Sequence, residues 1–135
     1  MTKTLTLALM DPPYESANST TAFRIISAAL KKGIHVNVFA YEGAVYVPFA
    51  KQAAHANAVH GRSVEEENHP LPRAWLQALM REASAHEAKL DWVNCGLCVD
   101  ERGAAEAIEG VRRGTPADLW NFAQTSDNTL VIGTK

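Results

Sequence analysis

The first forty residues contain a strand, a helix and a second strand in close succession, and this succession constrains the fold more than any other feature. Leu5, Leu7 and Leu9 alternate with small or polar residues and predict a first strand of about six residues. A second apolar run begins at Ile34 and ends before Tyr41. Because strands joined by a helix pair in parallel through a right-handed crossover, this unit predicts an α/β fold.

The helix between these strands has recognisable start and stop signals. Asn18–Thr20 offer N-cap side chains, and Lys31–Gly33 supplies a cationic last turn followed by a glycine. The apolar residues at helical spacing between them are Ala22, Phe23, Ile26, Ala29 and Leu30. The segment therefore predicts an amphipathic helix that covers one face of a parallel sheet.

The second half of the chain continues the alternation of helices and strands. Pro72 suits the first position of an amphipathic helix, and Leu90–Asn94 predicts a third parallel strand. A short helix is expected over Ala104–Val111, a last helix from Pro116, and a closing strand over Leu130–Ile132. The whole pattern predicts a three-layer α/β/α sandwich with a mainly parallel sheet.

The segment from Ala44 to His69 has the weakest pattern. Ala44–Val47 is compatible with a short strand or with a pocket wall. Lys51–His60 is rich in alanine and could form a helix, whereas Gly61–His69 contains three consecutive glutamates and indicates a solvated loop.

Length and charge exclude several classes of protein. A chain of 135 residues is expected to form a single domain, residues 1–135, with a core that needs no disulfide. A net charge of -2 without a basic run argues against nucleic acid as a partner, and no stretch is long enough to predict a membrane span. The N-terminus does not resemble a signal peptide. We therefore expect a cytoplasmic protein, in which cysteines are more often free, catalytic or metal-binding than bridged.

Both cysteines lie just beyond the third predicted strand. Cys95 follows that strand directly, and Gly96 gives the backbone room to turn. A thiol at such a turn lies near backbone N–H groups that favour the thiolate, and Arg102 could add positive charge. Asp100 and Glu101 act in the opposite direction. Alternatively, Cys95 is a small buried apolar residue.

Cys98 stands three residues after Cys95 and completes a C-x-x-C sequence. This spacing is found in dithiol redox motifs, in which the first thiol is usually the more nucleophilic. In such motifs the pair opens a helix, whereas Asp100–Gly103 suggests a longer loop in this chain.

The carboxyl ends of three predicted strands carry polar or reactive residues. Functional groups gather at this edge of open parallel sheets. We therefore expect the loops Asp11–Ser19, Tyr41–Glu42 and Asn94–Arg102 to form one crevice, with Cys95 at its floor and the first loop as its wall. The candidate lining residues are Tyr14, Ser19, Tyr41, Glu42, Asn94 and Gly96.

The sequence predicts neither a metal site nor a cofactor. Zinc would need two more ligands, and the chain has no second C-x-x-C and no H-x-x-x-H. His55, His60 and His69 share no helical face, and we interpret them as surface residues. Glycine-rich phosphate-binding loops are also absent.

The order of these motifs resembles the DsrE/DsrF-like sulfur-relay family, in particular its DsrE and TusD-type members, over nearly the whole chain. The segments that carry the resemblance are Pro13-Tyr14, Ser19–Phe23, Gly33–His35, Phe39–Val45, Arg73–Trp75 and Cys95 with Arg102-Gly103. In the family, the active cysteine is followed eight residues later by the glycine of an Arg-Gly pair. Cys95 has this relation to Gly103, whereas Cys98 does not.

The resemblance implies a sulfurtransferase or sulfur carrier with a five-stranded parallel sheet. The cysteine that corresponds to Cys95 accepts sulfane sulfur from a donor protein as a persulfide and passes it to an acceptor protein. Family members form homotrimers or homohexamers, and some combine different subunits. Cys95 would then be the nucleophile. The residues of this chain add Cys98 as a possible resolving thiol and Arg102 as a possible electrostatic helper.

The chain departs from the family pattern between Cys95 and Arg102. Relay members usually have a small apolar run there, whereas this chain has a second thiol and two carboxylates. Two alternatives therefore remain beside the sulfur carrier. One is a C-x-x-C dithiol redox protein or sensor, and the other is an oligomeric module that binds a small ligand or a protein without catalysis.

Overall fold

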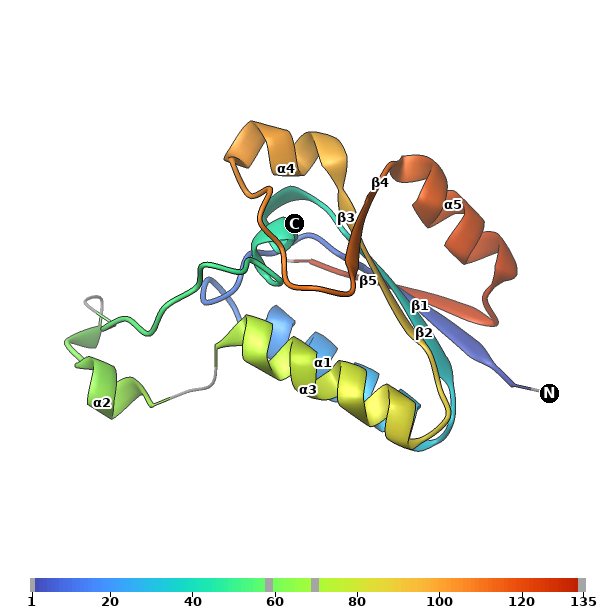
Figure 1. Ribbon diagram of the computed structural model, residues 1–135, viewed down its shortest axis with the longest axis horizontal. Coiled ribbons are helices and arrows are strands. Elements are labelled where there is room, and N and C mark those ends of the chain that lie inside the picture. The colour runs from blue at the N-terminus through green and yellow to red at the C-terminus, as the bar shows by residue number, and fades with distance from the viewer. Residues whose placement is uncertain (1, 58–59, 69–70, 134–135) are drawn as a thin grey trace.

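The computed structural model describes residues 2–57, 60–68 and 71–133, and its centre is a five-stranded parallel sheet (Figure 1). The strands lie in the order β4-β3-β2-β1-β5, and each neighbouring pair runs parallel. They span β1 (Thr4–Leu9), β2 (His35–Ala40), β3 (Leu90–Cys95), β4 (Val111–Gly114) and β5 (Asn128–Ile132). The predicted α/β class and the number of strands are confirmed.

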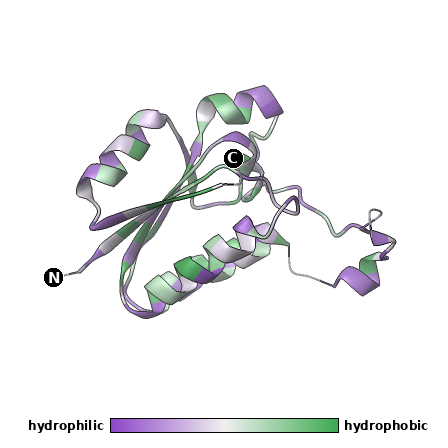
Figure 2. Cartoon of the chain, turned by 180° about the vertical axis from the view of Figure 1, so that it is seen from behind, coloured by the Kyte–Doolittle hydropathy of each residue, from purple (hydrophilic) through white to green (hydrophobic). Residues whose placement is uncertain are grey.

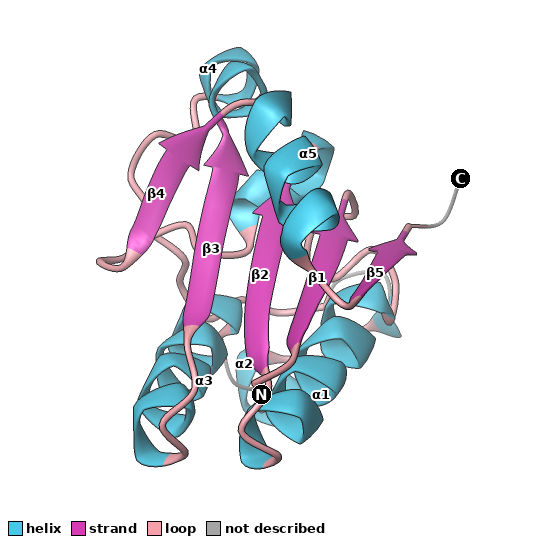
Figure 3. Cartoon of the chain, turned by 90° about the vertical axis from the view of Figure 1, so that its right-hand side faces the viewer, coloured by secondary structure: helices cyan, strands magenta, loops and turns pink. Residues whose placement is uncertain are grey.

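Helices cover the two faces of this sheet unequally. Helices α1 (Asn18–Lys31) and α3 (Pro72–Ala85) lie side by side on one face, and α5 (Pro116–Thr125) lies on the other (Figures 1 and 3). Pro72 and Pro116 each occupy the first turn of their helix, as the sequence predicts. The molecule therefore has three layers, with the thinner layer on the α5 side.

Alternation along β3 decides which side chains reach the cysteine site. Trp92 packs in the large core under α1 and α3, whereas Val93 and Cys95 pack with Phe122 of α5. Since successive side chains of a strand point to opposite faces, Asn94 shares the face of Trp92 and not that of Cys95. The nucleophile candidate thus faces the α5 layer.

The helix predicted over Ala104–Val111 is wrong. The structure has α4 (Gly96–Arg102) instead, which ends at Gly103 in the left-handed conformation with φ 64°. The C-x-x-C sequence therefore opens a helix after all. The following loop leads into β4, which pairs with β3 from Trp92↔Val111 to Cys95↔Gly114. As an edge strand with two exposed arginines, β4 lacks the apolar alternation that would reveal it in the sequence.

The segment after β2 also differs from expectation. Ala44–Val47 was expected to form a short strand or a pocket wall. The structure has a 3-10 helix there, η1 (Glu42–Tyr46). The alanine-rich residues 51–57 form no helix, and α2 (Val64–Glu67) begins inside the predicted loop. Ser63 and Glu66 cap this short helix reciprocally, which explains its location. Figure 2 shows that α2, away from the sheet, is mostly hydrophilic.

Within the described residues, no helix combines the length and the apolar character needed to cross a membrane.

Candidate functional site

Cys95 occupies the junction between β3 and α4. It is the last residue of the strand and the N-cap of the helix, with extended backbone angles of φ -63° and ψ 121°. Its residue surface is 6% exposed, and its side chain packs with Phe39, Val93 and Phe122. Burial beside apolar side chains limits the access of bulk water to the sulfur, while the strand end leaves one side toward the surface.

Cys98 lies one helical turn further along α4 and is half-buried. The backbone N–H of Glu42 donates a hydrogen bond to the Cys98 Sγ at 3.1 Å. Burial is the largest cause that raises the pKa of Cys98, and the N–H of Glu42 opposes it. A hydrogen bond to the Cys95 side chain and repulsion from that thiolate raise the pKa of Cys98 further. The Cys98 side chain also packs against the apolar cluster that contains Cys95, so the two thiols lie in the same part of the structure.

Arg102 holds the end of α4 against η1. Its Nη2 donates to Oε2 of Glu42 at 2.8 Å, and its Nη1 donates to the carbonyl oxygen of Cys98 at 3.4 Å. The hydroxyl of Tyr46 donates to the carbonyl oxygen of Arg102 at 2.6 Å. These contacts give Arg102 a positioning role for the loop that carries the Glu42 N–H.

Arg113 is the arginine beside Cys95, and sequence reasoning missed it. Its guanidinium lies against Gly96, because a Cβ built on Gly96 would stand 2.6 Å from Arg113 Nε. Two hydrogen bonds, of 2.8 and 2.6 Å, hold the guanidinium on the carboxylate of Asp100. They are the main cause that raises the pKa of Arg113, and negative charge on the Cys95 sulfur is a smaller one. The missed signal was the basic pair before Gly114, which belongs to β4.

A pocket of about 300 Å³ is lined in part by Cys95. Its lining residues are Cys95, Gly96, Leu97, Arg113, Gly114, Thr115 and Pro116. The wall therefore comes from the junction of β4 and α5, whereas the sequence predicted that the loop after β1 would supply it. Sheet order explains the difference, because β1 lies two strands away from β3 and β4 is its direct neighbour.

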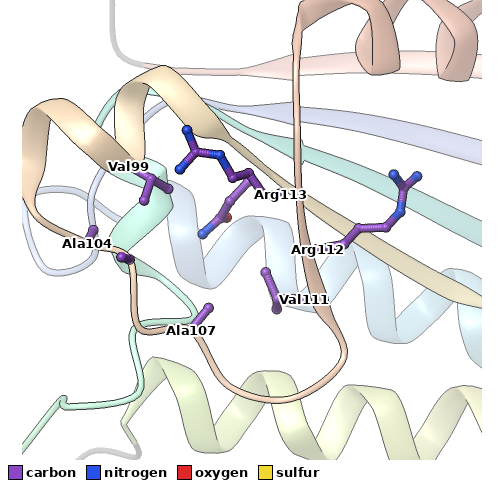
Figure 4. A pocket seen from close by; sticks show the side chains of 8 residues that line it. Val99, Ala104, Ala107, Val111, Arg112 and Arg113 are labelled. Carbon is purple, nitrogen blue, oxygen red and sulfur yellow. The ribbon is translucent and has the colours of Figure 1, made fainter.

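A second, smaller pocket of about 110 Å³ lies between α4 and β4 (Figure 4). Figure 4 shows Arg113 directed toward α4, whereas Arg112 points away from it. Arg112 binds both carboxylate oxygens of Asp91 at 3.0 Å. The lining residues are Asn94, Val99, Ala104, Ala105, Ala107, Val111, Arg112 and Arg113.

The structure brings some of the predicted lining residues to the thiols. Glu42 contacts Cys98 through its backbone N–H, and Gly96 lies against Arg113. Tyr41 packs against the apolar cluster that contains Cys95. Burial is also the main cause that raises the pKa of Tyr41.

The structure places the remaining predicted residues elsewhere. Asn94 is buried on the opposite face of β3, where it accepts a hydrogen bond from Trp92 Nε1 at 3.0 Å and donates to the carbonyl oxygen of Val45 at 3.2 Å. Tyr14 and Ser19 line a separate cavity against α1 and α3. The Tyr14 ring contacts that of His55, with 4.6 Å between the centroids.

Across residues 2–57, 60–68 and 71–133, no group of three His, Cys, Asp or Glu side chains could hold a metal ion. His69, one of the histidines considered from the sequence, lies outside these ranges.

Comparison with known proteins identifies the family. The model of the DsrE/DsrF-like family matches residues 3–132. The chain belongs to the DsrE/DsrF-like family. Members of this family generally function in sulfur relay with partner proteins, and a role related to sulfur relay follows for this chain.

Two relatives of similar length are uncharacterized proteins. One, from Methanocaldococcus jannaschii, is 29% identical over 94% of this chain and 97% of its own length. The other, from Methanopyrus kandleri, is 27% identical over 93% of this chain and 91% of its own length. Their similarity extends over nearly the whole chain.

Solved structures share the fold at low sequence identity. The ychN protein from E. coli superimposes with a TM-score of 0.67 and 21% identity, covering 97% of this chain and 99% of its own. A conserved protein of unknown function from Bacteroides thetaiotaomicron has a TM-score of 0.59 and 12% identity. The match covers 96% of this chain and 95% of that protein's chain. These neighbours support the DsrE-like fold alone.

Proposed function

We propose that this protein is a cytoplasmic sulfurtransferase or sulfur carrier that holds sulfane sulfur as a persulfide on Cys95. The observation that carries the proposal is the location of Cys95, at the carboxyl end of a parallel strand and in a pocket shared with Arg113. Arg113 lies against Gly96, the residue that follows Cys95. Positive charge beside a thiol favours the thiolate. Membership of the DsrE/DsrF-like family supports the same chemistry.

The proposed transfer needs no oxidant or reductant besides its two sulfur partners. The Cys95 thiolate attacks the outer sulfur of a donor persulfide, so that a bond forms between Cys95 Sγ and this sulfur. The S–S bond of the donor breaks, and the donor leaves as a thiolate. An acceptor thiolate then attacks the outer sulfur of the Cys95 persulfide and regenerates the Cys95 thiolate.

The pocket favours a protein segment as donor or acceptor. Its mouth carries Leu97, which is 70% exposed, and Pro116. An exposed leucine beside a reactive thiol suits a transient contact with an apolar loop that presents a cysteine. We propose donor and acceptor proteins as partners, and a homotrimer, a homohexamer or a mixed oligomer as the working assembly.

The test is intact-protein mass spectrometry after incubation with a persulfide-loaded donor, followed at early times. Wild type and Cys98→Ser should each gain one sulfur atom, whereas Cys95→Ser should gain none. The two serine variants are matched, since each removes one thiol of the same helix turn. Sulfur gain by Cys95→Ser would overturn the proposal.

A further inference from the structure

We propose that Cys98 resolves the Cys95 persulfide, so that the protein releases sulfide and keeps an internal Cys95–Cys98 disulfide. The inference rests on the proposed function, because it needs a persulfide on Cys95. It adds a second outcome for the bound sulfur besides transfer to an acceptor protein.

The positions of the two cysteines in α4 bring their side chains together. Cys95 is the N-cap of α4, and Cys98 is the third residue inside the helix. In a capping box, the side chains of these two positions reach toward each other's backbone. The chain uses the same positions in two other helices, with Ser63 and Glu66 in α2 and with Thr115 and Asp118 in α5. In α4 both positions are thiols, and the Cys98 side chain packs against the apolar cluster that contains Cys95.

The surroundings of Cys98 keep its sulfur close to Cys95. The N–H of Glu42 donates to Cys98 Sγ from one side, and the side chain also joins the apolar cluster of Val45 and Val99. Arg102 binds both the Glu42 carboxylate and the Cys98 carbonyl oxygen, which fixes this loop on the helix. A thiol that is held next to the reacting sulfur has a high effective concentration compared with thiols in solution.

The attack on the persulfide is balanced without a further reagent. The Cys98 thiol loses its proton, and its thiolate attacks Sγ of the Cys95 persulfide. A bond forms between the two Sγ atoms, while the bond from Cys95 Sγ to the outer sulfur breaks. The outer sulfur leaves with the bonding electron pair as hydrosulfide and takes up a proton to give hydrogen sulfide. The two cysteine sulfurs are oxidised to the disulfide, and the sulfane sulfur is reduced.

The experiment is a single turnover with full-length protein. Wild type, Cys98→Ser and Cys98→Ala are loaded on ice with a small-molecule persulfide donor, separated from it, and warmed without added thiol. Sulfide is then quantified, and the protein mass is followed. We expect wild type to release about one sulfide per chain and to end two hydrogens lighter than the reduced protein. Both Cys98 variants should retain the sulfur at least ten-fold longer.

Each further outcome separates this inference from the proposed function. Sulfur that remains on wild type as long as on Cys98→Ser would overturn the inference and leave the sulfur carrier intact. Sulfide release without an internal disulfide would also overturn it. If wild type takes up no sulfur at Cys95 but forms the disulfide with a mild oxidant, both proposals fail and the dithiol redox alternative is supported. Circular dichroism of the three proteins verifies that the variants are folded.

Discussion

Two thiols of one helical turn have different surroundings, and single residues account for the difference. Cys95 lines the pocket together with Arg113, whereas the half-buried Cys98 lies beside η1 and accepts the N–H of Glu42. The pKa of Cys98 is raised, first by burial and further by Cys95. Cys95 is thus the more buried thiol and lines a pocket, whereas Cys98 is the more exposed thiol and is held by η1.

The raised pKa of Cys98 predicts how its alkylation depends on pH. The folded protein is labelled with iodoacetamide at a series of pH values, and the peptide that contains Cys98 is then quantified. The labelling rate should reach half of its maximum at a pH above 9.0, the ordinary pKa of a thiol. Cys95→Ala should move the midpoint part of the way back, because burial remains as the main cause. The unfolded chain loses this proton at lower pH than the folded chain, so the free energy of unfolding should decrease as pH rises through 9.0. A midpoint below 9.0 would contradict the assignment.

Asn94 is predicted to matter for stability. Replacing it with alanine leaves the Trp92 N–H and the Val45 carbonyl oxygen without the hydrogen bonds that they make in the buried core. An unsatisfied buried polar group costs about 1–3 kcal/mol, so Asn94→Ala should lower the free energy of unfolding by about 2–4 kcal/mol in urea titrations. A change under 0.5 kcal/mol would contradict this role.

At the scale of secondary structure, the site depends on β4 more than on any loop. Because β4 pairs with β3, its Arg113 reaches across Gly96 to Asp100 of α4. Glycine at position 96 is needed for this approach, since any Cβ would displace the guanidinium. The short edge strand therefore places the positive charge beside Cys95.

Arg113→Gln should slow both alkylation and sulfur uptake at Cys95. Arg113 is exposed and paired with Asp100, so its interaction with the Cys95 sulfur is weak, and its loss should lower the rate by at most roughly five-fold. Arg112→Gln is the matched control, because this neighbour points away and pairs with Asp91. Equal effects of the two substitutions would assign the result to net charge and not to the position of Arg113.

For the molecule as a whole, the α5 side of the sheet is less completely covered than the other side. Trp120 of α5 is 65% exposed and Val131 of β5 is 67% exposed. Leu130 and Ile132 pack against the core under α1, so alternation directs Val131 to the α5 side. Contiguous exposed apolar side chains mark surfaces that another chain covers, and we propose that Trp120 and Val131 belong to such a surface.

This surface predicts where an oligomer would form. Trp120→Glu should decrease the mass measured by sedimentation velocity from that of an oligomer toward that of one chain. Val64→Glu is the control, because Val64 is also exposed, at 41%, but lies on α2 away from the sheet. A wild-type protein that sediments as a monomer, or an unchanged mass for Trp120→Glu, would contradict the prediction.

Several helices and strands could be predicted because their signals are local in the sequence. Apolar alternation identifies β1, helical spacing identifies α1, and Pro72 and Pro116 mark the starts of α3 and α5. The predicted N-cap of α1 is wrong, because the N-cap is Ala17, without a side-chain hydrogen bond, and Asn18–Thr20 lie inside the helix. The C-x-x-C sequence likewise directed attention to the end of β3. These features depend on neighbours within a few residues along the chain, which the printed sequence contains.

The residues that meet at Cys95 come from segments that are distant along the chain, so the sequence could not predict them. Strand order places β4 beside β3 and β1 two strands away, so Arg113 joins the thiol while Tyr14 and Ser19 line another cavity. Strand alternation turns Asn94 to the opposite face. An edge strand with exposed charged side chains has no apolar period, and contacts between distant segments leave no local signal. For these physical reasons the cation beside Cys95 became visible only in the folded chain.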